Sequence, residues 1–382
     1  MIKKCLCDRI NMEVFMETAN IEKLRYLLEK ELKKYKGEDH IKLNVDHQLL
    51  EEIIFKDEND DCKVLAMDFE LIKKLDLTGV SFDKVRIDGL DFTNSKGVVI
   101  NPQTVYEKRF TYTTLDKGVT VKGSFYKARV LGFNVNGAQG VVINPQHVYN
   151  KVLLDGSYKG AKFEGDFRGA DIRNCNFEGS SNALINPRDV ARLDCVGVNF
   201  KDTTIVGCFD DVIINNTKFG GSVGASINPQ TIRYESGKKE FEHCDFKDVT
   251  FTKPFTTFNF KDCSFRGSHN AIVDPQKLFN NNFRFENLDF GDITFVETES
   301  GMFSNYIIMN CNFEGSKNTR INFNTVRECI NNDLADVTIM GGLDKCTKFP
   351  NNYDRVILHK DACDEQLAQN EIAKIKKLNK GN

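Results

Sequence analysis

Apolar residues recur at every fifth position along most of this chain, and a small residue stands two places before each of them. The stretch 175–179 shows the pattern, with Cys175 as the small residue, Phe177 as the central apolar residue and Gly179 at the end. A helix face repeats every 3.6 residues and a strand face every two. A period of five fits neither, and it predicts a backbone that turns a corner after each short side.

The fifth position of each group is often Gly, Asn or Asp, and these residues tolerate the positive φ of tight turns. Other groups in the same phase are Leu90–Asn94, Ala161–Gly165, Cys244–Asp248, Cys263–Gly267 and Cys311–Gly315. Four such sides close a square coil of about twenty residues, and stacked coils pair their backbones at roughly 4.8 Å. The sequence therefore predicts a mainly β solenoid with its apolar residues inside.

A second, longer period is superimposed on the first. Ile or Val followed by Asn-Pro or Asp-Pro occurs five times, with the prolines at Pro102, Pro145, Pro187, Pro229 and Pro275. The intervals between these prolines are 43, 42, 42 and 46 residues. A sixth copy at 321–323 lacks the proline. A fixed period of this length indicates a repeat architecture. It equals two coils and a small excess, which we place at the Asn-Pro corner.

The chemistry of that corner predicts a short helical turn. Asn or Asp before proline favours an N-cap, and proline is well suited to the first helical position. The aliphatic residues on both sides of the corner are expected to point inward, while its polar tip projects along one edge of the solenoid. The aliphatic residues after the corners are Val105, Val148, Val190, Ile232 and Leu278.

Taken together, the groups of five resemble the pentapeptide-repeat family over about residues 75–350. In that family the central Leu or Phe and the small residue two places earlier both point inward. Three pairs of this chain match those positions: Phe177 with Cys175, Phe246 with Cys244, and Phe163 with Ala161. The resemblance implies a right-handed quadrilateral β-helix. Four-residue sides at 166–169 and 208–211 depart from the family pattern, and so does the Asn-Pro segment.

The ends of the chain do not follow the repeat. Residues 1–74 are predicted to form a small helical N-terminal domain, with helices over 20–36, after Asp46 and from Asp68 to Lys74, and with a polar loop over 56–61. Solenoids need ends that cover the open core and the unpaired strand edge. We therefore favour a capping role for this domain, although it could also carry a recognition surface of its own.

The C-terminal segment, 351–382, follows the β-helix of residues 75–350. Its residues 361–378 have the apolar spacing of an amphipathic helix. Such a helix would cover the last coil or would pair with a second copy of the chain, which allows a homodimer.

Composition narrows the classes of function. The 30 phenylalanines are explained by the central repeat position, so they do not indicate a surface for stacking nucleic-acid bases. A net charge of −3, from 52 basic and 55 acidic residues, argues against general nucleic-acid binding, although a local patch can escape the whole-chain balance. The chain has no stretch of eighteen apolar residues and no signal peptide, so we expect a cytoplasmic protein without membrane contact.

The sequence contains no recognised catalytic or metal-binding pattern. Its six histidines are scattered, and its 12 cysteines form no paired C-x-x-C motif. Four cysteines occupy the small inward position, where Cys acts as a small hydrophobe: Cys175, Cys244, Cys263 and Cys311. Cys5 and Cys7 lie close together but have no second pair nearby. We therefore expect no enzymatic activity and no cofactor.

The preferred hypothesis is a non-enzymatic scaffold that binds another protein. A periodic row of corners presents one feature at regular intervals, and solenoids commonly bind partners along such extended faces. The Asn residues cap turns, whereas the outward polar residues beside them have less of a role in holding the fold together. The predicted contact edge consists of Gln103, Gln146, Arg188, Gln230 and Gln276.

The family resemblance implies an alternative of a different class. One branch of pentapeptide-repeat proteins mimics duplex DNA, binds a type II topoisomerase (gyrase) to inhibit or protect it, and confers quinolone resistance. Those proteins typically carry an acidic face and dimerise through their C-terminal ends. The nearly neutral charge of this chain favours the scaffold, and one continuous acidic face would favour the DNA mimic.

Overall fold

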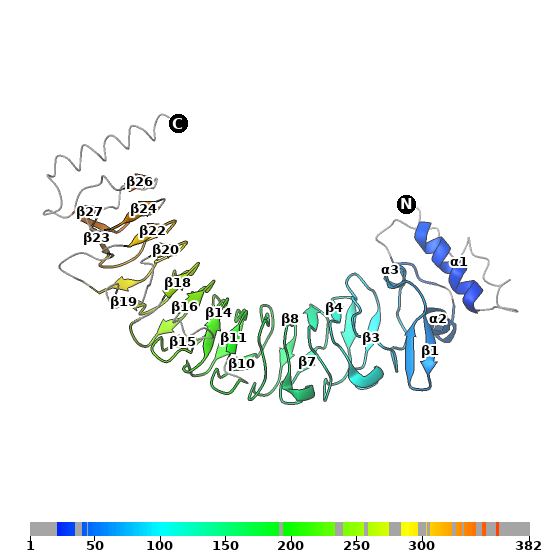
Figure 1. The fold of residues 1–382 in the computed structure, drawn as a ribbon. Helices are drawn as coiled ribbons and strands as arrows, with labels where there is room; N and C mark the ends of the chain where they lie inside the picture. The colour runs from blue at the N-terminus through cyan, green and yellow to red at the C-terminus, as the bar shows by residue number, and fades with distance from the viewer. Residues whose placement is uncertain are drawn as a thin grey trace. The chain divides into compact units, whose positions relative to one another are not determined.

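The computed structural model describes residues 21–34, 40–43, 45–190, 194–233, 240–255, 259–274, 284–296, 303, 306–322, 326–330, 332–340, 346–348 and 357–358. The chain divides into two compact units, Met1–Leu184 and Ile185–Asn382. Within each unit short parallel strands are stacked coil upon coil (Figure 1). The predicted mainly β solenoid is therefore confirmed. The predicted domain boundaries at 74/75 and 350/351 stay predictions.

Three helices begin the first unit: α1 (Ile21–Lys34), α2 (His47–Ile54) and α3 (Phe69–Ile72). The carboxylate of Asp46 accepts a hydrogen bond from the Leu49 amide at 2.8 Å, and that of Asp68 accepts one from the Glu70 amide at 2.9 Å. These are the N-caps that the sequence predicts. The predicted helix of residues 361–378 lies outside the described residues, as do Cys5 and Cys7.

The predicted polar loop at 56–61 is wrong. The chain forms an antiparallel hairpin there, made of β1 (Phe55–Asn59) and β2 (Cys62–Leu65). Only Phe55 of β1 is buried, so the strand has no alternation of apolar and polar residues that could have revealed it. Backbone pairing forms it instead.

The N-terminal segments also pair with the first coil. The Lys63 amide donates to the Lys84 carbonyl, and the Arg86 amide donates to the Lys63 carbonyl, both at 2.8 Å. Ile41 makes a parallel bridge to Leu75 in the same manner. These bonds cover backbone groups that would otherwise form an open strand edge.

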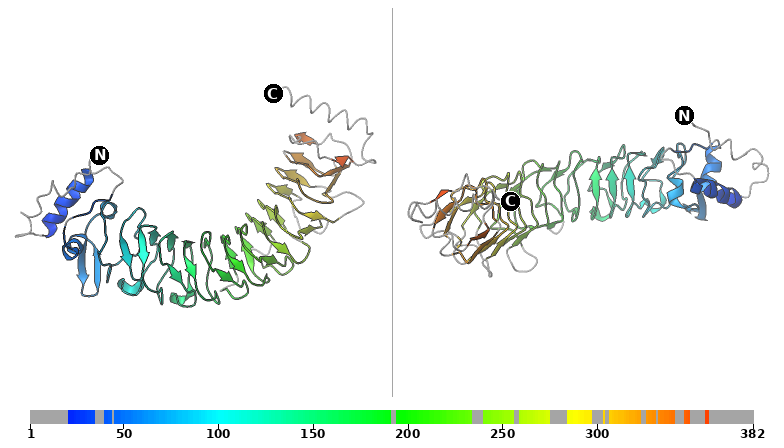
Figure 2. Two further views of the ribbon diagram at one scale, coloured as in Figure 1. Left: turned by 180° about the vertical axis from the view of Figure 1, so that it is seen from behind. Right: turned by 90° about the horizontal axis from the view of Figure 1, so that it is seen from above.

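The solenoid strands of each unit pair in parallel (Figure 2). In the first unit they are β3 (Val98–Ile100) with β5 (Val119–Val121), β4 (Thr114–Asp116) with β6 (Asn134–Asn136) and β8 (Ser157–Lys159), and β7 (Val142–Ile143) with β9 (Lys162–Phe163). Val98 pairs with Val119 and Thr114 with Asn134, so each partner stands one predicted coil further along the chain. The predicted length of the coil is confirmed.

The second unit continues the same arrangement. Its strands are β11 (Asp194–Val196) with β14 (Ile213–Asn215), β13 (Cys208–Phe209) with β15 (Ser226–Ile227) and β17 (Thr250–Phe251), β16 (Glu240–Glu242) with β18 (Asn259–Lys261), β19 (Ile272–Val273) with β21 (Thr294–Phe295), β20 (Arg284–Glu286) with β22 (Ile307–Met309), β24 (Glu328–Ile330) and β26 (Cys346–Lys348), and β23 (Arg320–Asn322) with β25 (Thr338–Met340) and β27 (Ile357–Leu358). β10 (Leu184–Ile185) and β12 (Thr204–Ile205) complete the list.

Buried central residues show how the longer period arises. From one corner to the next they are Ile185, Val190, Cys195, Phe200, Ile205, Phe209, Ile214, Phe219 and Ile227. Most steps are of five residues, one is of four, and the step from Phe219 to Ile227 is of eight. The excess therefore lies in the side before the Asn-Pro corner, whereas we predicted it at the corner itself. Gly224 turns the chain within that step at a φ of +77°.

Stacked phenylalanines fill the core. The Phe200 and Phe219 rings have centroids 5.4 Å apart at an interplanar angle of 22°, and Phe219 stacks in turn on Phe246 at 6.0 Å and 16°. The predicted inward cysteines are buried among them, as Cys175 and Cys244 illustrate. The abundance of Phe is thus a property of the core, as predicted.

Candidate binding edge

The Asn-Pro corners of the first unit are Asx turns. The side-chain oxygen of Asn101 accepts a hydrogen bond from the Gln103 amide at 3.0 Å, and Asn144 accepts one from the Gln146 amide at 2.9 Å. The Thr104 amide closes a turn onto the Asn101 carbonyl. Val105 then adopts an extended conformation, with a φ of −63° and a ψ of 153°. The predicted helical turn is therefore a single turn that does not continue into an α-helix.

A glycine of the next coil lies against each of the first three corners. Gly123, Gly165 and Gly207 have φ values of +119°, +90° and +103°. A Cβ atom on them would come within 2.8, 2.9 and 3.3 Å of the carboxamides of Asn101, Asn144 and Asn186. The four-residue sides follow these glycines, so both departures from the groups of five belong to one structural feature. These three glycines recur at intervals of 42 residues, close to the 43 and 42 between the first three prolines, and this regularity in the sequence could have predicted their role.

Gln103 and Gln146 bridge from the corner to the next coil. The Gln103 carboxamide nitrogen donates to the Ser124 and Tyr126 carbonyls at 2.7 and 3.0 Å. That of Gln146 donates to the Asp166 and Arg168 carbonyls at 3.1 and 2.7 Å. The expectation that these glutamines have little structural reason is wrong, because they satisfy carbonyls of the four-residue side.

The remaining predicted residues differ from these two. Arg188 forms an ion pair with Asp210. The backbone amide of Gln230 donates to Asn228 at 3.2 Å, and Gln230 is exposed. Gln276 lies outside the described residues. The structure thus brings Gln103 and Gln146 onto one edge of the first unit, and the role of all five residues in binding stays a prediction.

Exposed tyrosines and cations share this edge in the first unit. The Arg129 guanidinium lies 4.5 Å from the ring centroid of Tyr149, and the Lys127 ammonium lies 5.4 Å from that of Tyr126. Backbone bonds from the Lys127 amide to the His147 carbonyl and from the Tyr149 amide to the Ala128 carbonyl hold the two coils together. We define the basic–aromatic edge as Arg86, Tyr106, Tyr126, Lys127, Arg129 and Tyr149.

The basic–aromatic edge was not predicted, although the sequence carries a signal for it. Arg86 stands one coil before Tyr106, and Arg129 stands one coil before Tyr149. Tyr126 and Tyr149 are 46% and 45% exposed. A side chain that is half exposed on a rigid coil is available to a partner without a large cost in conformational entropy.

Ion pairing distinguishes two cations of this edge from those at the same corners in the second unit, whereas Arg86 of the edge pairs with Glu58 at 2.6 Å. Among the described residues, Lys127 and Arg129 lie within ion-pair distance of no carboxylate. In the second unit Arg188 pairs with Asp210, and Arg233 pairs with Asp211 at 3.1 Å. Lys127 and Arg129 therefore keep positive charge that a whole-chain count of charges conceals.

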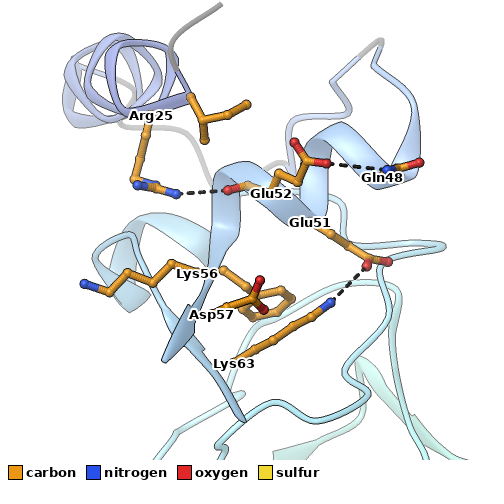
Figure 3. Close-up of a pocket in the computed structure, with 9 residues that line it drawn as sticks. Arg25, Gln48, Glu51, Glu52, Lys56, Asp57 and Lys63 are labelled. Carbon is orange, nitrogen blue, oxygen red and sulfur yellow. Dashed lines mark hydrogen bonds and ion pairs between the residues drawn. The ribbon is translucent and has the colours of Figure 1, made fainter. Parts of the chain in front are cut away.

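A separate hollow of about 410 Å³ lies between α1, α2 and the β1–β2 hairpin (Figure 3). The Arg25 side chain donates to the Ile53 and Glu52 carbonyls at 2.7 and 2.9 Å, which caps the end of α2. Glu51 accepts from the Ser81 amide at 2.6 Å and faces Lys63 at 3.9 Å. Because these polar groups already bond to one another, the hollow is explained as a structural junction.

Two further observations concern metal binding and membrane-spanning helices. Within the residues that the structure describes, no group of three His, Cys, Asp or Glu side chains is placed to hold a metal ion. None of the described helices combines the length and the apolar character needed to cross a membrane.

Known structures that resemble this chain share little sequence with it. No family model matches the chain, and no curated protein matches it. Among solved structures it is similar to HetL, a pentapeptide repeat protein involved in heterocyst differentiation regulation from the cyanobacterium Nostoc, with 9% identity over 66% of this chain and 90% of that one and a TM-score of 0.16. It is also similar to QnrB1, a plasmid-mediated fluoroquinolone resistance protein, with 12% identity over 62% and 89% and a TM-score of 0.17.

The class is defined by the coils themselves. Parallel strands that pair one coil apart, with inward Phe and Cys at the predicted positions, make this chain a β-solenoid whose architecture is consistent with the pentapeptide-repeat family.

Proposed function

We propose that this chain is a non-enzymatic scaffold that binds another protein along the basic–aromatic edge of its first unit. The observation that supports this proposal is the pair of exposed rings, Tyr126 and Tyr149, held on consecutive coils beside cations. Tyr and Arg are among the residues most enriched where protein interfaces derive their binding energy. The corner geometry holds these side chains in place before a partner arrives.

Site-specific photocrosslinking tests the proposal. A photoreactive phenylalanine analogue replaces Tyr126 or Tyr149 of the full chain in source cells, and Tyr26 is the control. Tyr26 is 64% exposed on α1 and lies outside the basic–aromatic edge. We expect a discrete crosslinked protein from positions 126 and 149 and none from position 26. Equal yields from all three positions, or none from any, would contradict the proposal.

Topoisomerase binding by DNA mimicry is the alternative, and it needs one continuous acidic face. In the second unit, however, cations alternate with carboxylates: Lys261 pairs with Glu242, and Arg266 lies 3.0 Å from Asp289 and 3.6 Å from Glu314. We therefore place the scaffold first. A supercoiling assay with purified gyrase, with and without a quinolone, separates the two functions, because only the mimic should change the enzyme's activity.

A further inference from the structure

We infer that the basic–aromatic edge binds an extended acidic peptide segment of the partner, whose carboxylates contact Lys127 and Arg129. This inference rests on the proposed function, because it names the kind of partner that the same edge accepts. Three features of the edge support it: its charge, the occupation of its rings and the spacing of its coils.

The charge of the edge requires an anionic partner. Any protein that covers Tyr126 and Tyr149 also removes water from Lys127 and Arg129, which lie beside those rings. A cation that loses its water without gaining a counter-charge is costly. A purely apolar partner surface would therefore be rejected, whereas carboxylates would replace the lost water.

The rings explain why carboxylates fit better than nucleic-acid bases. Base stacking needs a free ring face. Arg129 already covers one face of Tyr149, and Tyr126 has Lys127 over its ring and the edge-on ring of His147 at 5.6 Å. A guanidinium stacked on a ring keeps its planar fork of N–H donors, which matches a carboxylate.

The small number of unpaired cations also disfavours a nucleic acid. On the neighbouring coils Arg109 pairs with Glu107 at 3.3 Å and Arg168 pairs with Asp166 at 3.7 Å, so their charges are already balanced. A phosphate backbone carries a charge at every nucleotide and needs a longer row of cations than Lys127 and Arg129. A peptide can place its few carboxylates on these two residues.

The spacing of the coils favours an extended segment. Successive coils are about 4.8 Å apart, and an extended peptide rises about 3.3 Å per residue. The peptide therefore passes from the coil of Tyr126 to that of Tyr149 within two residues. A chain of alternating acidic and small residues would place its carboxylates on one side, toward the edge.

Fluorescence anisotropy with the full chain tests the inference. The probe is a fluorescein-labelled decapeptide of alternating Glu and Ser, compared with the same peptide carrying Gln for Glu and with a decamer of deoxythymidine. The variant is K127Q/R129Q. The control is K159Q/K162Q, which removes the same charge from exposed positions elsewhere in the first unit. Circular dichroism confirms that both variants fold.

We expect the Glu peptide to bind, the K127Q/R129Q variant to weaken it at least tenfold, and the control to leave it within twofold. Added salt should weaken binding further. Equal binding of the Gln peptide, no binding of the Glu peptide, or tighter binding of the thymidine decamer would overturn the inference. If position 126 gave crosslinks but the Glu peptide did not bind, the proposed scaffold function would be retained and only the acidic nature of the partner would be refuted.

Discussion

Asn144 and Gly165 fix the shape of one corner between them. The Asn144 side chain turns the chain by accepting the Gln146 amide, and Gly165 leaves space for that side chain in the next coil. Its φ of +90° is a conformation that residues with a Cβ rarely adopt. The requirement for glycine here is thus both conformational and steric.

Replacing Gly165 by Ala should lower the free energy of unfolding by about 2–3 kcal/mol, because both the backbone strain and the contact with Asn144 oppose the new methyl group. Gly89→Ala is the matched control: its φ is +80°, yet a Cβ there would meet no atom within 4 Å. It should cost only about 1–2 kcal/mol, from strain alone. Urea unfolding measures both variants, and equal losses would show that the contact with Asn144 is unimportant.

Asp76 makes stability depend on acid pH. Burial opposes its ionisation, but the Thr78 hydroxyl at 2.6 Å and the Lys96 ammonium at 2.9 Å outweigh burial and lower its pKa to about 2. An ordinary Asp has a pKa near 3.9. The folded state therefore binds its proton less readily than the unfolded state, and the stabilisation is present above about pH 4 and is lost as the pH falls toward 2.

We expect Asp76→Asn to lose less stability than the wild type when the pH is lowered from 5 to 2.5. Asp61→Asn serves as the control, because the side chain of Asp61 is 89% exposed and should change this pH dependence little. Urea midpoints at the two pH values give the comparison. Parallel pH curves for Asp76→Asn and the wild type would refute the assigned role.

At the scale of elements, the four-residue side depends on the preceding corner. The carboxamides of Gln103 and Gln146 each donate two hydrogen bonds to carbonyls of that side. The corner and the short side act as one element that spans two coils.

Gln146→Ala should lower the free energy of unfolding by about 1–2 kcal/mol, because two carbonyls lose a donor at a partly buried position. Gln146→Glu should cost more at neutral pH, since a carboxylate would face the Asp166 and Arg168 carbonyls. Gln139→Ala, at an exposed position of the same coil, is the control. If all three variants were equally stable, the carboxamide bridge would contribute nothing.

The elements that were predicted correctly are those whose signal is local. Groups such as Cys175 to Gly179 revealed the coil, and Asp46 revealed the start of α2, because each is specified by neighbouring residues. The β1–β2 hairpin was missed because its stability comes from backbone pairing. The bridge made by Gln103 was missed because its acceptors lie on the next coil, and Lys127 and Arg129 were hidden by the nearly neutral whole-chain charge.

At the scale of the whole molecule, the repeating unit is two coils. Removal of residues 101–143 joins Ile100 to Asn144 and recreates an Ile-Asn-Pro corner with its following short side. Removal of residues 101–121 takes out a single coil and its Asn corner. Each repeat of a solenoid is stabilised mainly by its contacts with the neighbouring coils. The length of the deletion therefore decides whether the two coils that become neighbours have matching corners.

We expect the 101–143 deletion to unfold cooperatively and to have a higher thermal midpoint than the 101–121 deletion, although it removes twice as much of the chain. Differential scanning calorimetry of both variants gives the result. A higher midpoint for the single-coil deletion would show that successive coils are interchangeable.

The alternation of Asn and Gly corners also bears on how the chain avoids misfolding. Repeat proteins can nucleate at any point and can join coils that are not true neighbours. In the native stack Asn101 lies against Gly123, and Asn144 lies against Gly165. If a coil paired with the next but one, the Asn101 carboxamide would meet that of Asn144. In the same way Gly123 would stand opposite Gly165, with an unfilled gap between them. Only slips of two coils would preserve the contacts, and these require a much larger loop to form. The corners should therefore select the correct neighbour during folding as well as shape the finished solenoid.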